Sequence, residues 1–159
     1  MKKGDTMIDN LEIKKLAPTD ERVLEVINFL SEESFNLFIQ NNLKEFDNLE
    51  HDKKDKFKEL ALRQGIDYYL SCDGEIYVAY LNDAIIGSAL RNNDSLDSLF
   101  VKKEYRNQKV GGTLLEKVLN DCKEYQVIRL NANIKAISLY QRYGFCQNGQ
   151  IEKNLIVPM

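Results

Sequence analysis

Apolar and polar residues alternate along the first regular segment of the chain, Leu11–Leu16. An alternation of period two predicts a short β-strand with one buried face. Beyond it, apolar residues recur at three- and four-residue spacing, which predicts one face of a helix with Thr19 or Asp20 as its N-cap. The residues of this face are Val23, Leu24, Val26, Ile27 and Leu30.

The chain then stays apolar for a few residues before it becomes densely charged. Four large side chains predict a second helical or irregular piece, namely Phe35, Leu37, Phe38 and Ile39. Residues 44–58 mix acidic and basic side chains without an apolar stripe, which predicts a solvated helix face or a loop.

From residue 76 the pattern changes to short β-branched and aromatic runs separated by polar turns. It predicts three strands over residues 75–81, 84–91 and 95–101, joined by turns at residues 82–83 and 92–94. Turns this short connect antiparallel neighbours, so these strands form an antiparallel meander.

The last third of the chain alternates between helical and extended patterns. From about Val110, apolar residues at i, i+1, i+4 and i+5 predict a helix that packs on a sheet through Leu114, Leu115, Val118 and Leu119. A strand over residues 126–130 and a helix over residues 134–143, ended by Gly144, follow. The chain closes with a hairpin of residues 145–147 and 150–157 around Asn148 and Gly149. This order predicts an α+β or mixed α/β fold with a sheet packed between helices.

Composition limits the class of protein. The chain has 159 residues, of which 43% are hydrophobic and 30% charged, and it lacks repeats or Pro/Gly linkers, so residues 1–159 are predicted to form a single domain. The net charge of −3 argues against a nucleic-acid binder. Residues 1–80 hold 11 basic and 17 acidic side chains, net −6, whereas residues 81–159 hold 11 and 8, net +3. That asymmetry suggests an anionic ligand on the second half and a cationic one on the first.

Cysteine and histidine content indicates the compartment and argues against a metal site. Three cysteines at long spacings and the one histidine, His51, form neither a zinc motif nor a disulfide framework, so no metal is expected. The N-terminal residues lack the apolar region of a signal peptide, and no apolar run is long enough to span a membrane. We therefore expect a cytoplasmic protein with no membrane association.

The clearest chemical signal lies in residues 99–115, where a predicted strand is followed by a basic loop and then by the start of a helix. Unpaired backbone N–H groups and the positive end of a helix dipole would hold an anion there, and Gly111 and Gly112 would let a phosphate approach the main chain. Four basic side chains surround the loop: Lys102, Lys103, Arg106 and Lys109. The segment matches neither GxGxxG nor the P-loop, so a basic surface loop that merely caps a helix is the alternative interpretation.

A second motif lies further along the chain. Residues 133–145 match N-x-x-A-x-x-L-Y-x-x-x-G-F, and they follow a short predicted strand. Together the two segments resemble the acyl-CoA site of the GNAT superfamily of N-acetyltransferases. The resemblance implies a mostly antiparallel central sheet with helices on both faces and a V-shaped splay between strands four and five.

The resemblance also implies which residues bind acetyl-CoA. The main chain of Leu99, Phe100 and Val101 would pair with the pantetheine arm. The Q/R-x-x-G-x-G/A loop of the family corresponds to residues 106–111, and backbone amides of this loop and the following helical turn would bind the pyrophosphate. The residues concerned are Arg106, Asn107, Gln108, Lys109, Val110, Gly111, Gly112 and Thr113.

Lys109 departs from the family pattern because it stands where the first glycine is usual. Its ammonium would add positive charge beside the phosphates, whereas its Cβ would crowd them and weaken the affinity for CoA. A register that begins at Gln108 restores a glycine, at Gly111, but breaks the spacing from Val101.

Three more residues receive roles from the resemblance. Asn133 resembles a residue that hydrogen-bonds the pantetheine, and it is also a candidate N-cap of the following helix. Tyr140 corresponds to the tyrosine that protonates the departing thiolate, which is chemically sound because a phenol of pKa ~10 stays protonated at neutral pH. Asp97, on the fourth strand, is the candidate general base, with ordered water as the alternative. His51 is expected to be solvent-exposed.

The resulting hypothesis is an acetyl-CoA-dependent N-acetyltransferase in which a primary amine attacks the thioester directly in a ternary complex. The acceptor would be a small-molecule or peptide amine, bound by residues 20–70 and the final hairpin, whose acidic bias favours a cationic molecule such as a polyamine or an aminoglycoside. The chain would act as a monomer or homodimer. Two alternatives are a non-catalytic acyl-CoA-binding regulatory module and an interaction domain that uses residues 44–58.

Overall fold

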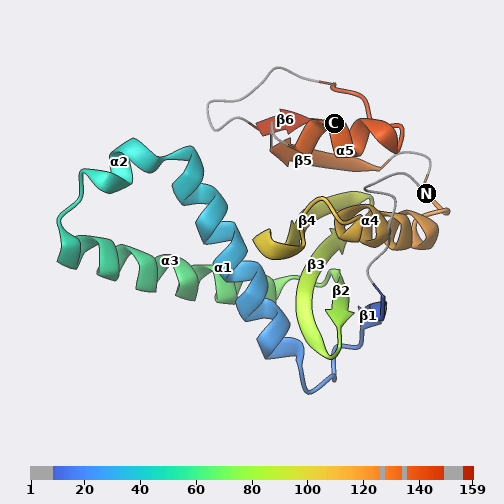
Figure 1. Ribbon diagram of the computed structural model, residues 1–159, viewed down its shortest axis with the longest axis horizontal. Helices are drawn as coiled ribbons and strands as arrows, with labels where there is room; N and C mark the ends of the chain where they lie inside the picture. Colours follow the sequence, from blue (N-terminus) through green and yellow to red (C-terminus); the bar gives the residue numbers. More distant parts are fainter. Residues whose placement is uncertain (1–8, 126–127, 134–135, 149–155) are drawn as a thin grey trace. The chain divides into compact units, whose positions relative to one another are not determined.

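The computed structural model describes residues 9–125, 128–133, 136–148 and 156–159. The chain divides into two compact units. Residues Met1–Leu16 and Gly74–Met159 form the first, which we call the sheet unit, and residues Ala17–Asp73 form the second, the helical unit. Figure 1 labels the elements of both units.

The sheet unit contains a mixed sheet whose strands follow one another in chain order. Within the described residues the strands are β1 (Leu11–Leu16), β2 (Glu75–Leu81), β3 (Ala84–Asn92), β4 (Ser95–Val101), β5 (Arg129–Asn133) and β6 (Ile156–Pro158). All neighbours run antiparallel except β4 and β5, which are parallel. The predicted fold class, a mixed α/β fold with a mostly antiparallel sheet, is confirmed.

The meander of β2, β3 and β4 agrees with its prediction to within one residue. Asn82 and Asp83 both have positive φ, +50° and +67°, as the two central residues of a type I′ turn require. Asn93, in the next turn, also has positive φ. Asparagine and aspartate tolerate this conformation, so the local sequence alone determines where these strands end.

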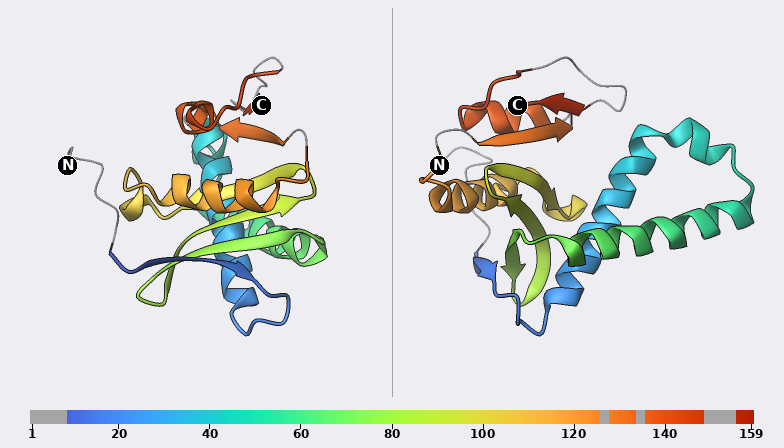
Figure 2. Two further views of the ribbon diagram at one scale, coloured as in Figure 1. Left: turned by 90° about the vertical axis from the view of Figure 1, so that its right-hand side faces the viewer. Right: turned by 180° about the vertical axis from the view of Figure 1, so that it is seen from behind.

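The helix α4 (Val110–Asp121) packs on this sheet and contacts β2, β3 and β4, as Figure 2 shows. Leu114, Leu115 and Val118 are fully buried in the core, and Leu119 is half-buried, which confirms the predicted stripe. The same core holds Tyr77 of β2.

The strand β5 begins three residues later than predicted, and the helix α5 (Ile137–Arg142) lies within the predicted helix, whose first residues, 134–135, are outside the described part of the chain. Leu130 and Ala132 are buried while Asn131 between them is exposed, so β5 follows a period-two pattern. Leu130 also exchanges backbone hydrogen bonds of 2.8 Å with Met159.

Two further predictions in this region are wrong. Asn133 is the last residue of β5, and Ala136 precedes α5, so Asn133 is not the N-cap of that helix. Residues 145–148 form no strand, and β6 pairs with β5 rather than with a strand of residues 145–147. Residues 134–135 and 149–155, which include the predicted Asn148–Gly149 turn in part, lie outside the described residues.

The helical unit consists of α1 (Val23–Asn41), α2 (Leu43–Asp47) and α3 (His51–Ser71). One continuous α1 replaces the two pieces predicted, because Phe35 to Ile39 extend the same helix. Val26, Ile27 and Leu30 are buried as predicted, but Leu24 is 60% exposed. The helix begins at Val23 after Arg22, so neither Thr19 nor Asp20 is its N-cap; Asp20 Oδ1 instead accepts the Arg22 N–H at 2.8 Å.

The charge asymmetry of the sequence coincides with the two units. The helical unit holds 7 basic and 13 acidic side chains, net −6, and the sheet unit holds 15 and 12, net +3. Among the described residues, no helix combines the length and apolar character that crossing a membrane requires.

Candidate functional site

The strands β4 and β5 diverge from a short paired end. They pair only through Ser95 with Arg129 and Leu96 with Leu130. In the described part of the chain the pairing of β4 with β5 ends at Leu96, whereas the pairing of β4 with β3 runs on to Val101. The predicted V-shaped splay is therefore present.

Sheet alternation identifies which groups of β4 face the splay. The Lys102 N–H donates to Ile86 O at 2.8 Å, so every second residue, Phe100 included, directs its main-chain N–H and C=O toward β3. Leu99 and Val101 direct theirs to the open side. Consistent with this, Val101 O accepts a hydrogen bond of 3.0 Å from Arg106 Nε rather than from β3. The main-chain role predicted for all three residues therefore fits Leu99 and Val101, but not Phe100.

Asp97 is the extra residue of a β-bulge in β4. Leu90 pairs with Ser98 and Arg91 with Leu96, so Asp97 lies between two successive paired positions of β4. Its carboxylate is exposed and accepts hydrogen bonds from Ser95 Oγ, at 2.9 Å, and from Asn92 Nδ2. Both oxygens therefore stabilise the β3–β4 turn, and a role as general base stays a prediction.

The loop between β4 and α4 is compact and contains two left-handed residues. A 3₁₀ turn, Lys103–Tyr105, follows β4, and Gln108 Nε2 donates to Glu104 O at 3.0 Å. Asn107 and Lys109 have φ of +63° and +66°. Glycine reaches this conformation without steric cost, which explains physically why a glycine suits the position of Lys109.

The first turn of α4 offers main-chain donors. The first helical hydrogen bond runs from Thr113 N to Lys109 O at 3.0 Å, so the N–H groups of Val110, Gly111 and Gly112 precede any intrahelical acceptor. The Thr113 hydroxyl donates to the same carbonyl at 2.6 Å. Lys102, Lys103, Arg106 and Lys109 add positive charge along the loop. Such a turn favours an anion.

Tyr140 of α5 belongs to the core of the sheet unit and is only 7% exposed. Its ring meets that of Phe145 edge-on, with centroids 5.8 Å apart. Burial raises the pKa of the phenol to about 12, so it stays protonated at neutral pH. A protonated, desolvated phenol can donate to a developing thiolate, as its predicted role requires.

Gly144 fixes the end of α5. Its φ is +90°, its N–H donates to Gln141 O, and the Phe145 N–H donates to Tyr140 O. This pattern of hydrogen bonds is a Schellman motif, and the contact between Tyr140 and Phe145 is its apolar partner. The predicted helix end is confirmed.

Sequence reasoning missed one pair of residues at this site. Tyr143 Oη donates to Glu116 Oε1 at 3.0 Å, and the same phenol lies against Gly112. Burial and the neighbouring carboxylate raise the pKa of Tyr143. The sequence signal is weak: Glu116 follows Gly112 by one helical turn, and Tyr143 precedes a C-terminal glycine.

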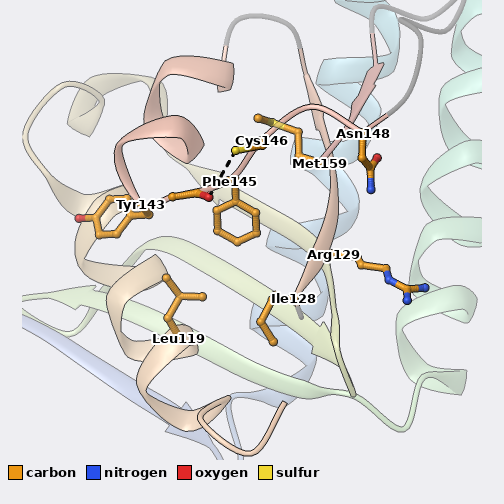
Figure 3. A pocket seen from close by; sticks show the side chains of 9 residues that line it. Leu119, Ile128, Arg129, Tyr143, Phe145, Cys146, Asn148 and Met159 are labelled. Atoms are coloured by element: carbon orange, nitrogen blue, oxygen red, sulfur yellow. Dashed lines mark hydrogen bonds between the residues drawn. The ribbon is translucent and has the colours of Figure 1, made fainter. Parts of the chain in front are cut away.

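The remaining candidate features contain no predicted catalytic or cofactor-binding residue. A cavity of about 360 Å³, shown in Figure 3, involves none of the predicted site residues. It is lined by Leu119, Ile128, Arg129, Tyr143, Gly144, Phe145, Cys146, Asn148 and Met159. His51 lies in the helical unit with its side chain 93% exposed, as expected. Among the described residues, no group of His, Cys, Asp or Glu has an arrangement suited to a metal ion.

Comparison with known proteins places this geometry in a family. A family model described as an acetyltransferase (GNAT) domain matches residues 23–157. The structure is similar to the PaiA N-acetyltransferase of Thermoplasma acidophilum in complex with coenzyme A, with a TM-score of 0.60 and 22% identity over 93% of this chain and 97% of that one.

Two curated relatives share shorter stretches of sequence. An uncharacterized N-acetyltransferase of Dictyostelium discoideum is 43% identical over 54 residues, 31% of this chain and 25% of that protein. A Bacillus subtilis protein named probable spermine N(1)-acetyltransferase is 34% identical over 65 residues, 37% of this chain and 43% of that protein. The matches thus span less than half of either relative. Since the family model covers most of the chain, the protein belongs to the GNAT acetyltransferase family.

Proposed function

We propose that the protein is an N-acetyltransferase that transfers the acetyl group of acetyl-CoA to a primary amine, by direct attack in a ternary complex. One observation carries this proposal: β4 runs on past the end of its pairing with β5, and Val101 there lies against Gly111 in the donor-rich first turn of α4. An extended thioester ligand with an anionic end fits that combination of groups.

The residues of the sheet unit fit coenzyme A. The N–H groups of Val110, Gly111 and Gly112, together with the basic side chains of the loop, would hold the pyrophosphate. Leu99 and Val101 would hydrogen-bond the pantetheine arm as a neighbouring strand does. The similar PaiA structure contains coenzyme A, which supports the same ligand here.

Groups of this chain would polarise the thioester carbonyl and give a proton to the departing sulfur. Acetyl-CoA, when bound, supplies an acetyl thioester that an amine can attack. Main-chain N–H groups of β4 would polarise the thioester carbonyl. Tyr140 Oη holds a proton that it can pass to the departing sulfur as the C–N bond forms and the C–S bond breaks. The amine must be neutral to attack, so its surplus proton passes to water or to Asp97.

For the acceptor we propose a small polycationic amine of the polyamine class. The helical unit, net −6, contains most of the residues expected to form the acceptor side. The Bacillus relative is named probable spermine N(1)-acetyltransferase, which supports the same class of amine. A lysine-containing peptide is the competing acceptor.

A direct test measures acetylated product by mass spectrometry for the full chain with acetyl-CoA and a panel of amines: spermine, spermidine, an aminoglycoside and a lysine peptide. We expect a rise in melting temperature with acetyl-CoA and turnover with the polyamines. Tyr140→Phe should keep the thermal shift and lower kcat by roughly 10²-fold, whereas Tyr68→Phe, which removes an exposed phenol, should not.

The outcomes separate the candidate functions. Binding of acetyl-CoA without turnover on any amine would favour the regulatory module. No thermal shift with either acetyl-CoA or CoA would overturn the proposed function altogether.

A further inference from the structure

The helix α5 rests on the glycine pair at the start of α4 through two side chains one helical turn apart. A Cβ placed on Gly111 would lie 3.5 Å from Leu139 Cδ2 and 3.6 Å from Val101 Cγ2, which are ordinary contacts. A Cβ placed on Gly112 would lie 2.8 Å from Tyr143 Oη, closer than real Cβ atoms approach. A side chain at Gly112 would therefore displace the Tyr143 hydroxyl, whereas one at Gly111 would displace nothing.

A hydrogen bond holds the Tyr143 phenol in this place. Tyr143 Oη donates to Glu116 Oε1 at 3.0 Å, and Glu116 lies one turn after Gly112 on the same face of α4. A larger residue at Gly112 would push on the hydroxyl that makes this bond. Gly112, Glu116 and Tyr143 thus form one contact, which we call the α4–α5 lock.

The lock is directly connected to the predicted general acid. The Tyr143 N–H donates to Tyr140 O at 3.0 Å, so the two tyrosines share the last turn of α5. On the other side, Gly112 belongs to the turn whose N–H groups face the proposed pyrophosphate site. The lock therefore joins the two parts of the site that must be held at a fixed separation.

We propose that Tyr143 is a positioning residue that, through the α4–α5 lock, sets the distance between Tyr140 and the anion-binding turn of α4. This inference rests on the proposed function. A displacement of about 1 Å at a catalytic group can lower a rate by up to 10²-fold, so loss of the lock should lower kcat while acetyl-CoA still binds.

The test is a double-mutant cycle between Gly112→Ala and Tyr143→Phe, with Gly111→Ala as the matched control. Gly112→Ala should lower both the melting temperature and kcat, the latter by about tenfold or more. Tyr143→Phe removes the atom that an alanine at position 112 would meet, and the next ring atom is 3.7 Å away. The double variant should therefore be no slower than Tyr143→Phe alone.

The control variants exclude a general effect on folding. Gly111→Ala places a Cβ in the same phosphate-binding turn but meets only ordinary contacts, so whatever it changes in acetyl-CoA binding or kcat should combine additively with Tyr143→Phe. Glu116→Gln keeps an acceptor for the phenol and should retain most activity, whereas Glu116→Ala should behave like Tyr143→Phe.

The result that would overturn the positioning role is additivity of Gly112→Ala and Tyr143→Phe in an active enzyme, or a fall in melting temperature with unchanged kcat and KM. Absence of acetyl transfer by the unmodified chain would overturn the proposed function and this role with it. The two failures are distinguishable because only the second appears before any substitution is made.

Discussion

The Lys109 carbonyl accepts two hydrogen bonds from Thr113, one from its N–H at 3.0 Å and one from its hydroxyl at 2.6 Å. Lys109 makes this contact in a left-handed conformation, with φ of +66°. For a residue with a Cβ this conformation costs about 1–2 kcal/mol, and glycine largely avoids the cost. The entrance to α4 is therefore strained at the very residue that precedes the proposed phosphate-binding turn.

Lys109→Gly should stabilise the protein. The relief of strain exceeds the added freedom of glycine in the unfolded chain, so we expect a gain of about 0.5–1 kcal/mol in the free energy of unfolding, measured by urea titration. Lys109→Ala is the control, because it keeps the Cβ and removes the rest of the side chain, the amine included. A stabilisation of equal size in both variants would contradict the strain argument.

The same two variants separate the charge of Lys109 from its shape in cofactor binding. If the amine attracts the phosphates, both variants weaken the affinity for acetyl-CoA equally, and the dependence of Kd on salt becomes shallower. If the Cβ crowds the phosphates, Lys109→Gly binds more tightly than Lys109→Ala. We expect the first result, because the Lys109 side chain is exposed.

The elements that sequence predicts well are those fixed by local chemistry. The β2–β4 meander follows from Asn82 and Asp83, whose positive φ can be inferred from residue type. The prediction from sequence misplaces β5 because the limits of this strand depend on partners far along the chain, Asp94 and Met159. No pattern within residues 126–133 reveals those partners.

The residues of the candidate site also differ in whether the sequence alone can predict them. Spacing along the chain is sufficient to predict the loop before α4 and Tyr140. It cannot distinguish Leu99 and Val101 from Phe100, because that choice depends on the hydrogen-bonding register with β3. Nor can it pair Tyr143 with Glu116, which lie 27 residues apart and meet only when the two helices pack.

Gly144→Ala should destabilise α5 through backbone strain alone. Gly144 has φ of +90°, and nothing lies within 4 Å of a Cβ placed on it, so a steric clash is absent. We expect a loss of about 1–2 kcal/mol in the free energy of unfolding. Gly144→Asn should lose less, since asparagine tolerates left-handed conformations better. Equal losses in urea titrations would argue against this explanation.

Asp97→Asn should lower stability without removing acetyl transfer. Its carboxylate already accepts hydrogen bonds from Ser95 and Asn92, and the amide keeps one acceptor, so a loss of about 1 kcal/mol is expected. The pH profile of kcat/KM should keep its acidic limb. A collapse of the rate together with loss of that limb would instead identify Asp97 as the general base.

In the helical unit, Gly65 of α3 faces Ser31 of α1. A Cβ on Gly65 would overlap Ser31 Oγ, which donates to Leu62 O at 2.9 Å. Gly65→Ala should therefore destabilise by about 1–3 kcal/mol despite its better helix propensity. Adding Ser31→Ala removes the overlapping atom, so the double variant should recover part of the loss. A purely additive result in thermal unfolding would contradict the overlap.

Two buried tyrosines should make the protein sensitive to alkali. Burial, chiefly, raises the pKa of both Tyr77 and Tyr140 to about 12, and Tyr77 Oη also donates to Asp121 Oδ2 at 3.0 Å. An unfolded tyrosine titrates near pH 10, so between about pH 10 and 12 the unfolded chain has released protons that the folded chain retains. The stability from each phenol is fully present below about pH 10 and is lost as pH rises toward 12, with a slope near 1.4 kcal/mol per pH unit.

Urea titrations between about pH 9 and 11.5 should therefore show a shallower decline for Tyr140→Phe than for the unmodified chain, by about one proton. Identical slopes would show that Tyr140 is not buried as the structure describes.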